Sequence, residues 1–255
     1  MGKTGAATTA AKAAPSLQMS LPSRKRGKDT FNVILTTAGH LLNEIGFDRL
    51  TTNLVCERAG LTPPALYRYF PNKYAILAEL ARQLMEAQDQ ALFRWQEAGG
   101  LGSADLEETV RRSIVLRKEL MTITRTFPGG LWILRAIRAL PPLHEVRIAS
   151  RELVLSRQFD MLRERYPGVS EETLHYAARL SEQSAYGMIE MLIEDPQLDE
   201  DRIIAEAAWM TALYFESLAD RDPAGRAPPA APAKTPAATR KPPSTRKATP
   251  RRSKG

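Results

Sequence analysis

Apolar residues near the start of the chain's body recur with the period of an α-helix. Between positions 31 and 45 they lie three or four residues apart, which places them on one face of a single helix. Gly46 follows directly and predicts that this helix ends in a left-handed cap. The apolar face consists of Phe31, Ile34, Leu35, Ala38, Leu41, Leu42 and Ile45.

Two short helices are predicted next. A threonine N-cap starts a helix over 52–59, and a glycine stops it. The third helix starts with two prolines, which a first turn tolerates because its N–H groups have no helical partner. A further proline keeps this helix short. The residues are Thr51 or Thr52 for the cap, Gly60 for the stop, Pro63 and Pro64 for the start, and Pro71 for the limit.

The helical period continues to about position 219, interrupted only by glycine and proline groups. No stretch shows the sustained alternation of apolar and polar residues that is typical of a strand. We therefore predict an all-α chain of nine helices. The six helices after the first three are expected from Pro71 to about Ala98, and over 104–125, 131–140, 143–165, 171–194 and 199–219.

The first three helices have a recognisable arrangement. Two short helices joined by a tight turn that contains Gly60, and braced by a preceding helix, are typical of a helix-turn-helix unit. The second helix of such a pair enters the major groove of DNA.

Positive charge gathers at both ends of the chain. Residues 1–28 hold six Lys or Arg and no acid, and residues 223–255 hold nine and no acid. Because the whole chain carries +7, the part between them has a net charge of −8. Segments 1–27 and 222–255 are predicted to be disordered, since they have too few apolar residues to form a core. They are either polycationic arms for nucleic-acid phosphates or solvated tails, and a transit peptide is a third interpretation of the first.

Several protein classes are excluded by composition. No apolar run approaches the roughly 18–20 residues that span a bilayer, so no membrane partner is expected. The N-terminus has no apolar signal region. Cys56 is the single cysteine, which rules out a disulfide framework and favours a reducing compartment. We expect a cytoplasmic, nucleoid-associated protein.

Residues 31–77 resemble the DNA-binding segment of the TetR family of bacterial transcriptional regulators. The resemblance implies a helix-turn-helix domain over 28–74 and a roughly six-helix regulatory and dimerisation domain over 75–221. Two positions depart from the family pattern: Pro63-Pro64 removes two backbone N–H groups, and Cys56 stands where the family prefers alanine. The matching motifs are Gly46-Phe47, Leu50-Thr51-Thr52, Ala59-Gly60-Leu61-Thr62, Leu66-Tyr67-Arg68-Tyr69-Phe70 and Lys73.

The same resemblance implies which side chains meet double-stranded DNA. Arg68 can pair with guanine and Asn53 with adenine, while hydroxyls and an ammonium group would hold phosphates. Alternatives remain: a surface salt bridge for Arg68, and ring packing for the tyrosines. The implied DNA contacts are Thr52, Asn53, Thr62, Pro63, Pro64, Ala65, Tyr67, Arg68, Tyr69 and Lys73.

A repressor that binds a palindromic operator as a homodimer is the expected function, because two reading heads double the number of base contacts. We expect the helices over 171–194 and 201–219 to build the dimer. A stripe of mostly small residues would let helices approach closely, although an intramolecular contact would look the same. This stripe is Ala177, Ala178, Ser181, Ser184, Ala185 and Met188.

The resemblance also implies a small-molecule effector bound between the middle helices, and aromatic residues there suggest an apolar or aromatic one. The competing interpretation is that these aromatics are ordinary core. The proposed lining is Phe93, Trp95, Phe127, Trp132, Phe159, Tyr176, Tyr186 and Trp209.

Two other functions fit parts of the sequence. The basic tails would suit a sequence-tolerant, nucleoid-type DNA binder. Glu172 and His175 have the spacing of half a di-iron site in a helical bundle, but neither His40 nor His144 supplies the second half. We therefore expect no enzyme activity, no metal and no cofactor.

Overall fold

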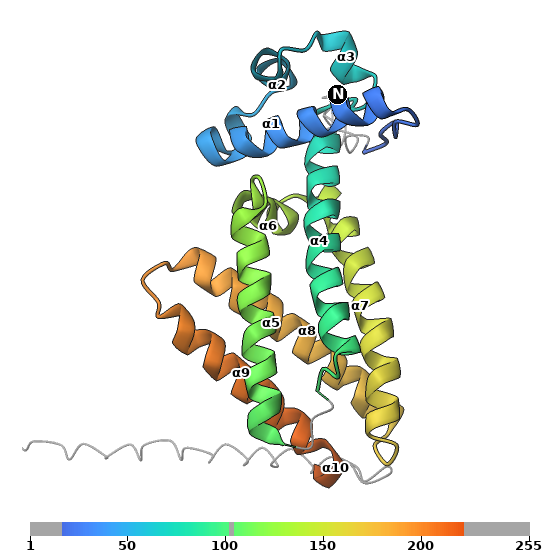
Figure 1. Cartoon of the computed structure of the whole chain (residues 1–255), viewed down its shortest axis with the longest axis vertical. Coiled ribbons are helices and arrows are strands. Elements are labelled where there is room, and N and C mark those ends of the chain that lie inside the picture. The colour runs from blue at the N-terminus through green and yellow to red at the C-terminus, as the bar shows by residue number, and fades with distance from the viewer. Residues whose placement is uncertain (1–16, 102–104, 222–255) are drawn as a thin grey trace, which may run out of the picture.

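A computed structural model describes residues 17–101 and 105–221, and within these ranges it contains helices and no strands (Figure 1). The expected tails 1–16 and 222–255 lie outside the described residues. The elements are α1 (Lys25–Arg49), α2 (Thr52–Ala59), α3 (Pro63–Tyr67), α4 (Lys73–Glu97), α5 (Leu106–Thr126), α6 (Gly130–Ala139), the 3-10 helix η1 (Pro141–Leu143), α7 (His144–Arg165), α8 (Glu171–Glu194), α9 (Glu200–Glu216) and α10 (Leu218–Arg221).

Several helix starts follow from local capping. Side-chain oxygens of Thr51, Asn72, Ser170 and Asp199 accept the first free backbone N–H groups of α2, α4, α8 and α9. Such caps satisfy donors that no intrahelical bond can reach. These signals are local, which explains why the predicted bounds agree closely with the structure.

Two helix ends differ from the prediction. The first helical segment of α1 is interrupted at Gly46 as predicted, but not by a left-handed cap: this residue forms a kink with φ +74° and ψ 176°, and a short second segment continues to Arg49. Only a glycine adopts this conformation without strain. The last predicted helix, 199–219, divides at Ser217 into α9 and α10.

A small head formed by α1, α2 and α3 sits on one end of the molecule (Figure 1). Its interior is aromatic: the ring of Phe31 stacks on Phe70 at 4.8 Å and meets Tyr69 edge-on at 5.9 Å. Arg58 on α2 donates to both carboxylate oxygens of Glu44 on α1, at 2.9 and 3.0 Å. The head is therefore held as one unit by rings inside and an ion pair outside.

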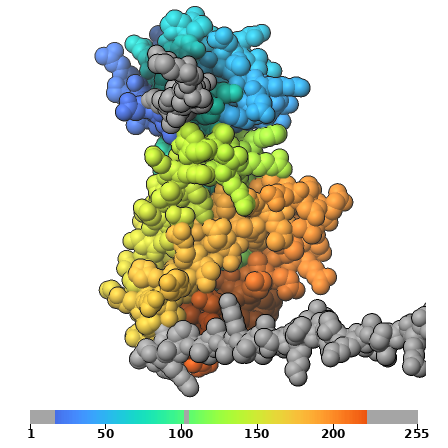
Figure 2. All heavy atoms as spheres, turned by 180° about the vertical axis from the view of Figure 1, so that it is seen from behind, coloured from blue at the N-terminus to red at the C-terminus, as the bar shows by residue number. Residues whose placement is uncertain are grey.

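The body is a bundle of long helices below the head. α4 and α7 run away from the head, α5 runs back towards it, and α8 and α9 cross them (Figure 1). α5 packs on α9, α7 packs on α8, and α4 contacts both α5 and α7. Figure 2 shows α7 and α8 from the opposite side, where they cover the body's back face. Among the residues described, no helix is long and apolar enough to span a membrane.

The head and the body meet through close backbone packing. A Cβ added to Gly39 of α1 would lie 2.5 Å from the Cβ and carbonyl oxygen of Pro128, in the turn before α6. At the kink in α1, the ring of Trp132 lies against Gly46. Glycine is needed at position 39 because any side chain would push the two segments apart.

The expected domain boundary between 74 and 75 falls at the start of α4. The first half of this helix buries Ile76, Leu77 and Leu80 in the same core as Leu41 of the head and Met121 of α5. The apolar core therefore continues from the head into the body, and α4 connects the two.

The basic N-terminal segment is shorter than predicted. Leu17 and Met19 pack against the head core, the backbone N–H of Ser20 donates to the Tyr69 carbonyl at 3.0 Å, and α1 already begins at Lys25. Residues 17–24 thus follow the surface of the head. The apolar side chains Leu17 and Met19, two residues apart, were the sequence signal for this packing.

Candidate nucleic-acid interface and internal cavity

The turn between α2 and α3 sets the orientation of α3. Gly60 adopts the left-handed conformation at φ +64° and ψ 32°, and the Leu61 N–H bonds the Cys56 carbonyl at 2.9 Å. This is the glycine-dependent helix stop that the sequence predicted. α3 then begins with Pro63 and is anchored by the fully buried side chain of Leu66.

The outer face of this unit carries the predicted contact residues. Asn53 on α2 and Arg68 after α3 are exposed. In the part of the chain that the structure describes, no carboxylate lies within salt-bridge distance of Arg68. The other exposed members are Thr62, Pro63, Pro64 and Tyr67, while Thr52, Ala65, Tyr69 and Lys73 are half-buried.

Four of these side chains have contacts with residues of the head. The Tyr67 hydroxyl and the Thr52 hydroxyl lie 3.0 Å apart and share a hydrogen bond across α2 and α3. Tyr69 packs its ring on Phe31, as the alternative interpretation held. Lys73 donates to the Phe47 carbonyl at 3.2 Å and lies over the Phe47 ring at 4.3 Å. Its ammonium group joins α4 to the end of α1, so it would have to leave that position to reach a phosphate.

A basic groove beside α3 was not predicted from the sequence, because Arg24 and Arg26 belong to the segment 1–27 that was expected to be disordered. The segment before α1 lies next to Tyr69, and the groove between them is lined by Arg24, Arg26 and Arg68, with Gly27 at its floor. The groove adds two guanidinium groups to the face that carries the predicted contacts.

Cys56 is buried in the head, as the small side chain at this position predicted. Burial raises the pKa of its thiol. A thiolate is the reactive form of cysteine, so this environment disfavours reactivity.

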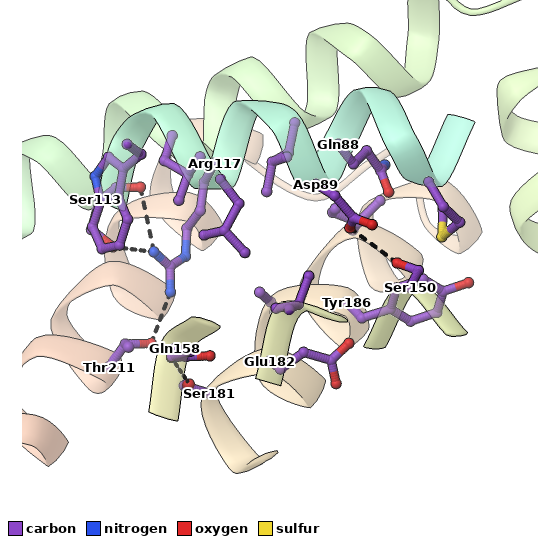
Figure 3. A pocket seen from close by; sticks show the side chains of 18 of the residues that line it. Gln88, Asp89, Ser113, Arg117, Ser150, Gln158, Ser181, Glu182, Tyr186 and Thr211 are labelled. Carbon is purple, nitrogen blue, oxygen red and sulfur yellow. Dashed lines mark hydrogen bonds between the residues drawn. The ribbon is translucent and has the colours of Figure 1, made fainter. Parts of the chain in front are cut away.

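The body contains a partly open cavity between α4, α5, α7, α8 and α9. Aliphatic side chains from α4 and α5 line the middle, and Trp95 and Tyr186 are its aromatic lining. Figure 3 shows polar side chains gathered in two groups across this space. An apolar lining with a few placed polar groups is typical of small-molecule sites in proteins.

One polar group joins α4, α7 and α8. The Ser150 hydroxyl donates to Asp89 at 3.0 Å, and Arg147 pairs with Glu182 while lying over the Tyr186 ring at 4.2 Å. Burial raises the pKa of Asp89 to about 6, although its bond from Ser150 and the charge of Arg147 act in the opposite direction. Burial also raises the pKa of the Tyr186 hydroxyl.

The second polar group joins α5, α9, α7 and α8. Arg117 donates to Ser113, to the Ala207 carbonyl and to Thr211, and Gln158 donates to Ser181 at 2.8 Å (Figure 3). The lining therefore combines a mostly apolar surface with several polar side chains, which were not part of the expected apolar or aromatic site.

The predicted aromatic lining does not come together around this cavity. Of the eight residues proposed, Trp95 and Tyr186 line it. The others are engaged elsewhere because their helix faces turn away. Phe93 lies under the Arg157 guanidinium, Phe127 packs on the main core, Trp132 contacts Gly46, Phe159 stacks on His175, and Tyr176 and Trp209 are exposed.

The predicted dimer stripe turns inward as well. Ala177 and Ala178 are buried in a core cluster with Leu162 of α7, and Met188 is buried in the main core. Ser181 and Ala185 line the cavity, and only Ser184 is exposed. The stripe thus makes the intramolecular contact that was its alternative interpretation, because small residues let α8 pack closely on α7.

The residues behind the metalloenzyme alternative have ordinary packing. The His175 ring stacks on Phe159 with 3.9 Å between ring centres. Within the described ranges, no group of three or more histidine, cysteine or acidic side chains could hold a metal ion.

Comparison with known proteins connects the head to one family. The family model described as bacterial regulatory proteins of the tetR family matches residues 34–80. The class A tetracycline repressor protein of Escherichia coli is 46% identical over 54 residues, which are 21% of this chain and 25% of that protein. The transcriptional regulator EthR of Mycolicibacterium smegmatis is 32% identical over 92 residues, which are 36% of this chain and 41% of that protein. The chain thus spans a quarter to two-fifths of these relatives.

The fold of the whole body is also similar to solved structures. SmeT, described as the repressor of the Stenotrophomonas maltophilia multidrug efflux pump SmeDEF, superposes with a TM-score of 0.56 at 21% identity, covering 74% of this chain and 92% of that one. This likeness concerns the fold alone.

Proposed function

We propose, from the premise that the chain belongs to the TetR family of bacterial regulatory proteins, that it is a dimeric, ligand-responsive repressor that reads a specific DNA site. The observation that carries this proposal is the outer face of α2 and α3. It presents Arg68 without an acidic partner among the described residues, beside exposed Asn53 and a groove with two further arginines.

The proposed roles of the individual side chains in DNA binding follow from their chemistry. Arg68 offers two parallel donors that match the O6 and N7 acceptors of guanine, and Asn53 matches the N6/N7 edge of adenine. Pro63 and Pro64 can make only apolar contacts, for example with a thymine methyl group. Arg24 and Arg26 in the basic groove would hold phosphates, which position the head without reading sequence.

Dimerisation is proposed through α8 and α9, but through a different face from the predicted stripe. Six large apolar side chains on these two helices are exposed, and Met210 is 68% exposed. An apolar surface that spans two packed helices is typical of a protein interface. A second copy would cover it as an isologous contact, because the same patch is used twice. The six are Tyr176, Leu180, Met191, Trp209, Met210 and Leu213.

The cavity is the proposed effector site. It lies along the second half of α4, whose first half is part of the head core. A ligand that favours one position of α4 would shift the spacing between the two heads of a dimer, and with it the affinity for the operator. A complex of the structural neighbour SmeT with triclosan shows that this fold can bind a small molecule in that protein.

The direct test is selection of binding sites from a random DNA pool by the purified full chain at about 150 mM salt, where non-specific phosphate contacts are weakened. An enriched inverted repeat is expected. Recovery of unenriched DNA would instead favour the sequence-tolerant binder, in which the basic tails supply the affinity. No recovery of DNA would refute both.

A further inference from the structure

Arg117 is the most unusual side chain of the cavity, because it is a buried cation. It is 4% exposed and projects from α5 towards Thr211 of α9 (Figure 3). Four acceptors around it are neutral: the Ser113 carbonyl and hydroxyl, the Ala207 carbonyl, and the Thr211 hydroxyl at 2.8 Å. Its Nε–H group is buried and has no hydrogen-bond partner among the residues described.

No charge compensates this guanidinium in the part of the chain that the structure describes. Salt bridges there involve other arginines, and Arg147 in the same cavity is paired with Glu182. Burial alone lowers the pKa of Arg117 to about 10, and no nearby carboxylate raises it. A buried charge without a partner is expensive, so such a residue is normally paired or awaits an anion.

The side chains near Arg117 indicate the chemistry of the rest of the ligand. The cavity continues from the guanidinium along aliphatic side chains, including Leu116, Leu120 and Ile189. These side chains would pack against a hydrocarbon or aromatic body. Arg117 can meet one oxygen of a planar anion through the free Nε–H, as guanidinium groups do with carboxylates.

We infer that the cavity binds an amphipathic anion, with an apolar body along α4 and α5 and a carboxylate at Arg117. This inference rests on the proposed function only in treating the cavity as the effector site. It replaces the apolar or aromatic effector expected from sequence with a class defined by charge.

A cationic ligand is the main competitor, because Asp89 and Glu182 line the opposite end. Glu182 is already paired with Arg147, which leaves only its Oε2 buried without a hydrogen-bond partner, and Asp89 receives a hydrogen bond from Ser150. The charge of Glu182 is therefore compensated within the protein, whereas Arg117 has no partner of opposite charge among the residues described. The observations favour the anion for this reason.

The test uses three probes that share one chain and differ in their head group: decanoate, 1-decanol and decylamine. Binding to the purified full chain is followed by calorimetry and by intrinsic tryptophan fluorescence, to which Trp95 in the cavity contributes, below the concentrations at which the probes form micelles. We expect decanoate to bind at least about tenfold more tightly than decanol, because a charge-assisted hydrogen bond is stronger than a neutral one. Decylamine should bind most weakly.

Two variants test the role of Arg117. Arg117→Met keeps an unbranched apolar side chain and should abolish the preference for decanoate over decanol. Arg111→Met is the control on the same helix, because Arg111 is exposed and pairs with Glu108 on the surface, and it should keep the preference. The unfolding temperature of the ligand-free Arg117→Met chain should not fall, since removing an uncompensated buried charge offsets the lost hydrogen bonds.

Three results would overturn the inference: no binding of decanoate, tighter binding of decylamine, or a decanoate preference that survives in Arg117→Met. A misfolded Arg117→Met would not hide the answer, because the ranking of the three probes in the wild-type chain tests the inference by itself. These readouts contain no DNA. A failure of the proposed DNA function would therefore appear in site selection and leave the probe ranking unchanged.

Discussion

Asp89 is a cavity side chain whose ionised form is disfavoured by burial. Its carboxyl group is largely removed from water between α4 and α7, and burial raises its pKa to about 6 from an ordinary value of 3.8. The Ser150 hydroxyl and the Arg147 charge oppose this shift, while Glu182 and Glu86 add to it. Asp89 therefore ionises at a higher pH in the folded chain than in the unfolded chain. At any pH where the unfolded chain is already ionised, this difference lowers the free energy of unfolding.

Asp89→Asn is therefore expected to stabilise the chain at pH 8 and to have no effect near pH 4. As the pH rises from about 4 to about 6, the unfolded chain loses its proton first and the wild type loses stability, whereas the asparagine variant has no such loss. Thermal unfolding across this pH range measures the effect. Asp160→Asn, on the exposed side of α7, serves as the control. A benefit of Asp89→Asn that is equal at pH 4 and pH 8 would show that the raised pKa of Asp89 is not its cause.

In the proposed function, base reading depends most on Arg68. Arg68→Ala should reduce the affinity for the selected site by roughly 10- to 100-fold, the usual value of a bidentate arginine–guanine contact. The measurement is fluorescence anisotropy of a labelled duplex. Arg111→Ala, which changes the same residue type on α5, should bind as the wild type does. Equal losses on the selected and on a scrambled duplex would show that Arg68 holds only phosphates.

At the scale of elements, the sequence predicts what depends on neighbours along the chain. The bounds of α2 and α3 follow from Thr51, Gly60 and the prolines, whose effects act within one turn. It does not predict which face of α8 turns inward. Ala177 and Ala178 suit a close helix contact with either α7 or a second copy, and only the three-dimensional packing on Leu162 decides.

The cavity and the N-terminal segment were missed for related reasons. Aromatic residues such as Phe93 and Phe159 are spaced for a helical bundle, but each finds a separate partner, and buried polar residues line the cavity instead. Polar residues spread over five helices have no common spacing along the sequence. Residues 17–24 were predicted to be disordered because the segment around them is basic. The apolar side chains of Leu17 and Met19 were the indication that they pack against the core.

Thr51 and Thr62 directly precede α2 and α3, and they are expected to contribute differently to stability. The Thr51 hydroxyl accepts the Leu54 N–H at 3.1 Å and caps α2, whereas Thr62 precedes α3 and makes no side-chain cap. Thr51→Ala should cost about 1 kcal/mol of unfolding free energy, and Thr62→Ala should cost less than about 0.5 kcal/mol. Urea unfolding measures both. Similar losses in the two variants would mean that capping does not hold the head together.

At the scale of the whole molecule, one continuous core links the reading head to the cavity through α4. Gly39 and Pro128 form a second connection, where α1 approaches the turn before α6 without room for a side chain. The molecule thus has the proposed reading surface at one end, a cavity in the body, and exposed apolar side chains on α8 and α9 where a second copy is proposed to bind. Each part of the proposed function has a separate location.

The proposed dimer can be broken without disturbing the protomer. Met210 and Leu213 are 68% and 50% exposed on α9, so replacing both with glutamate should leave folding intact and give a monomer. Light scattering at micromolar concentration should report about twice the chain mass of 28.3 kDa for the wild type and one chain mass for the variant. Val115→Glu changes an apolar residue on α5 that is 65% exposed and should remain dimeric. A monomeric wild type would refute the proposed interface.

The most direct test of sequence-specific DNA binding is the ratio of two affinities, one for the selected inverted repeat and one for a scrambled duplex of the same composition. The ratio should be measured with the full chain from about 50 to 300 mM salt, because phosphate contacts weaken steeply over this range. A specific regulator should prefer the inverted repeat by at least about 10³-fold near physiological salt. Equal affinities for both duplexes, falling together as salt rises, would contradict the proposed regulator and identify a binder of DNA without regard to sequence.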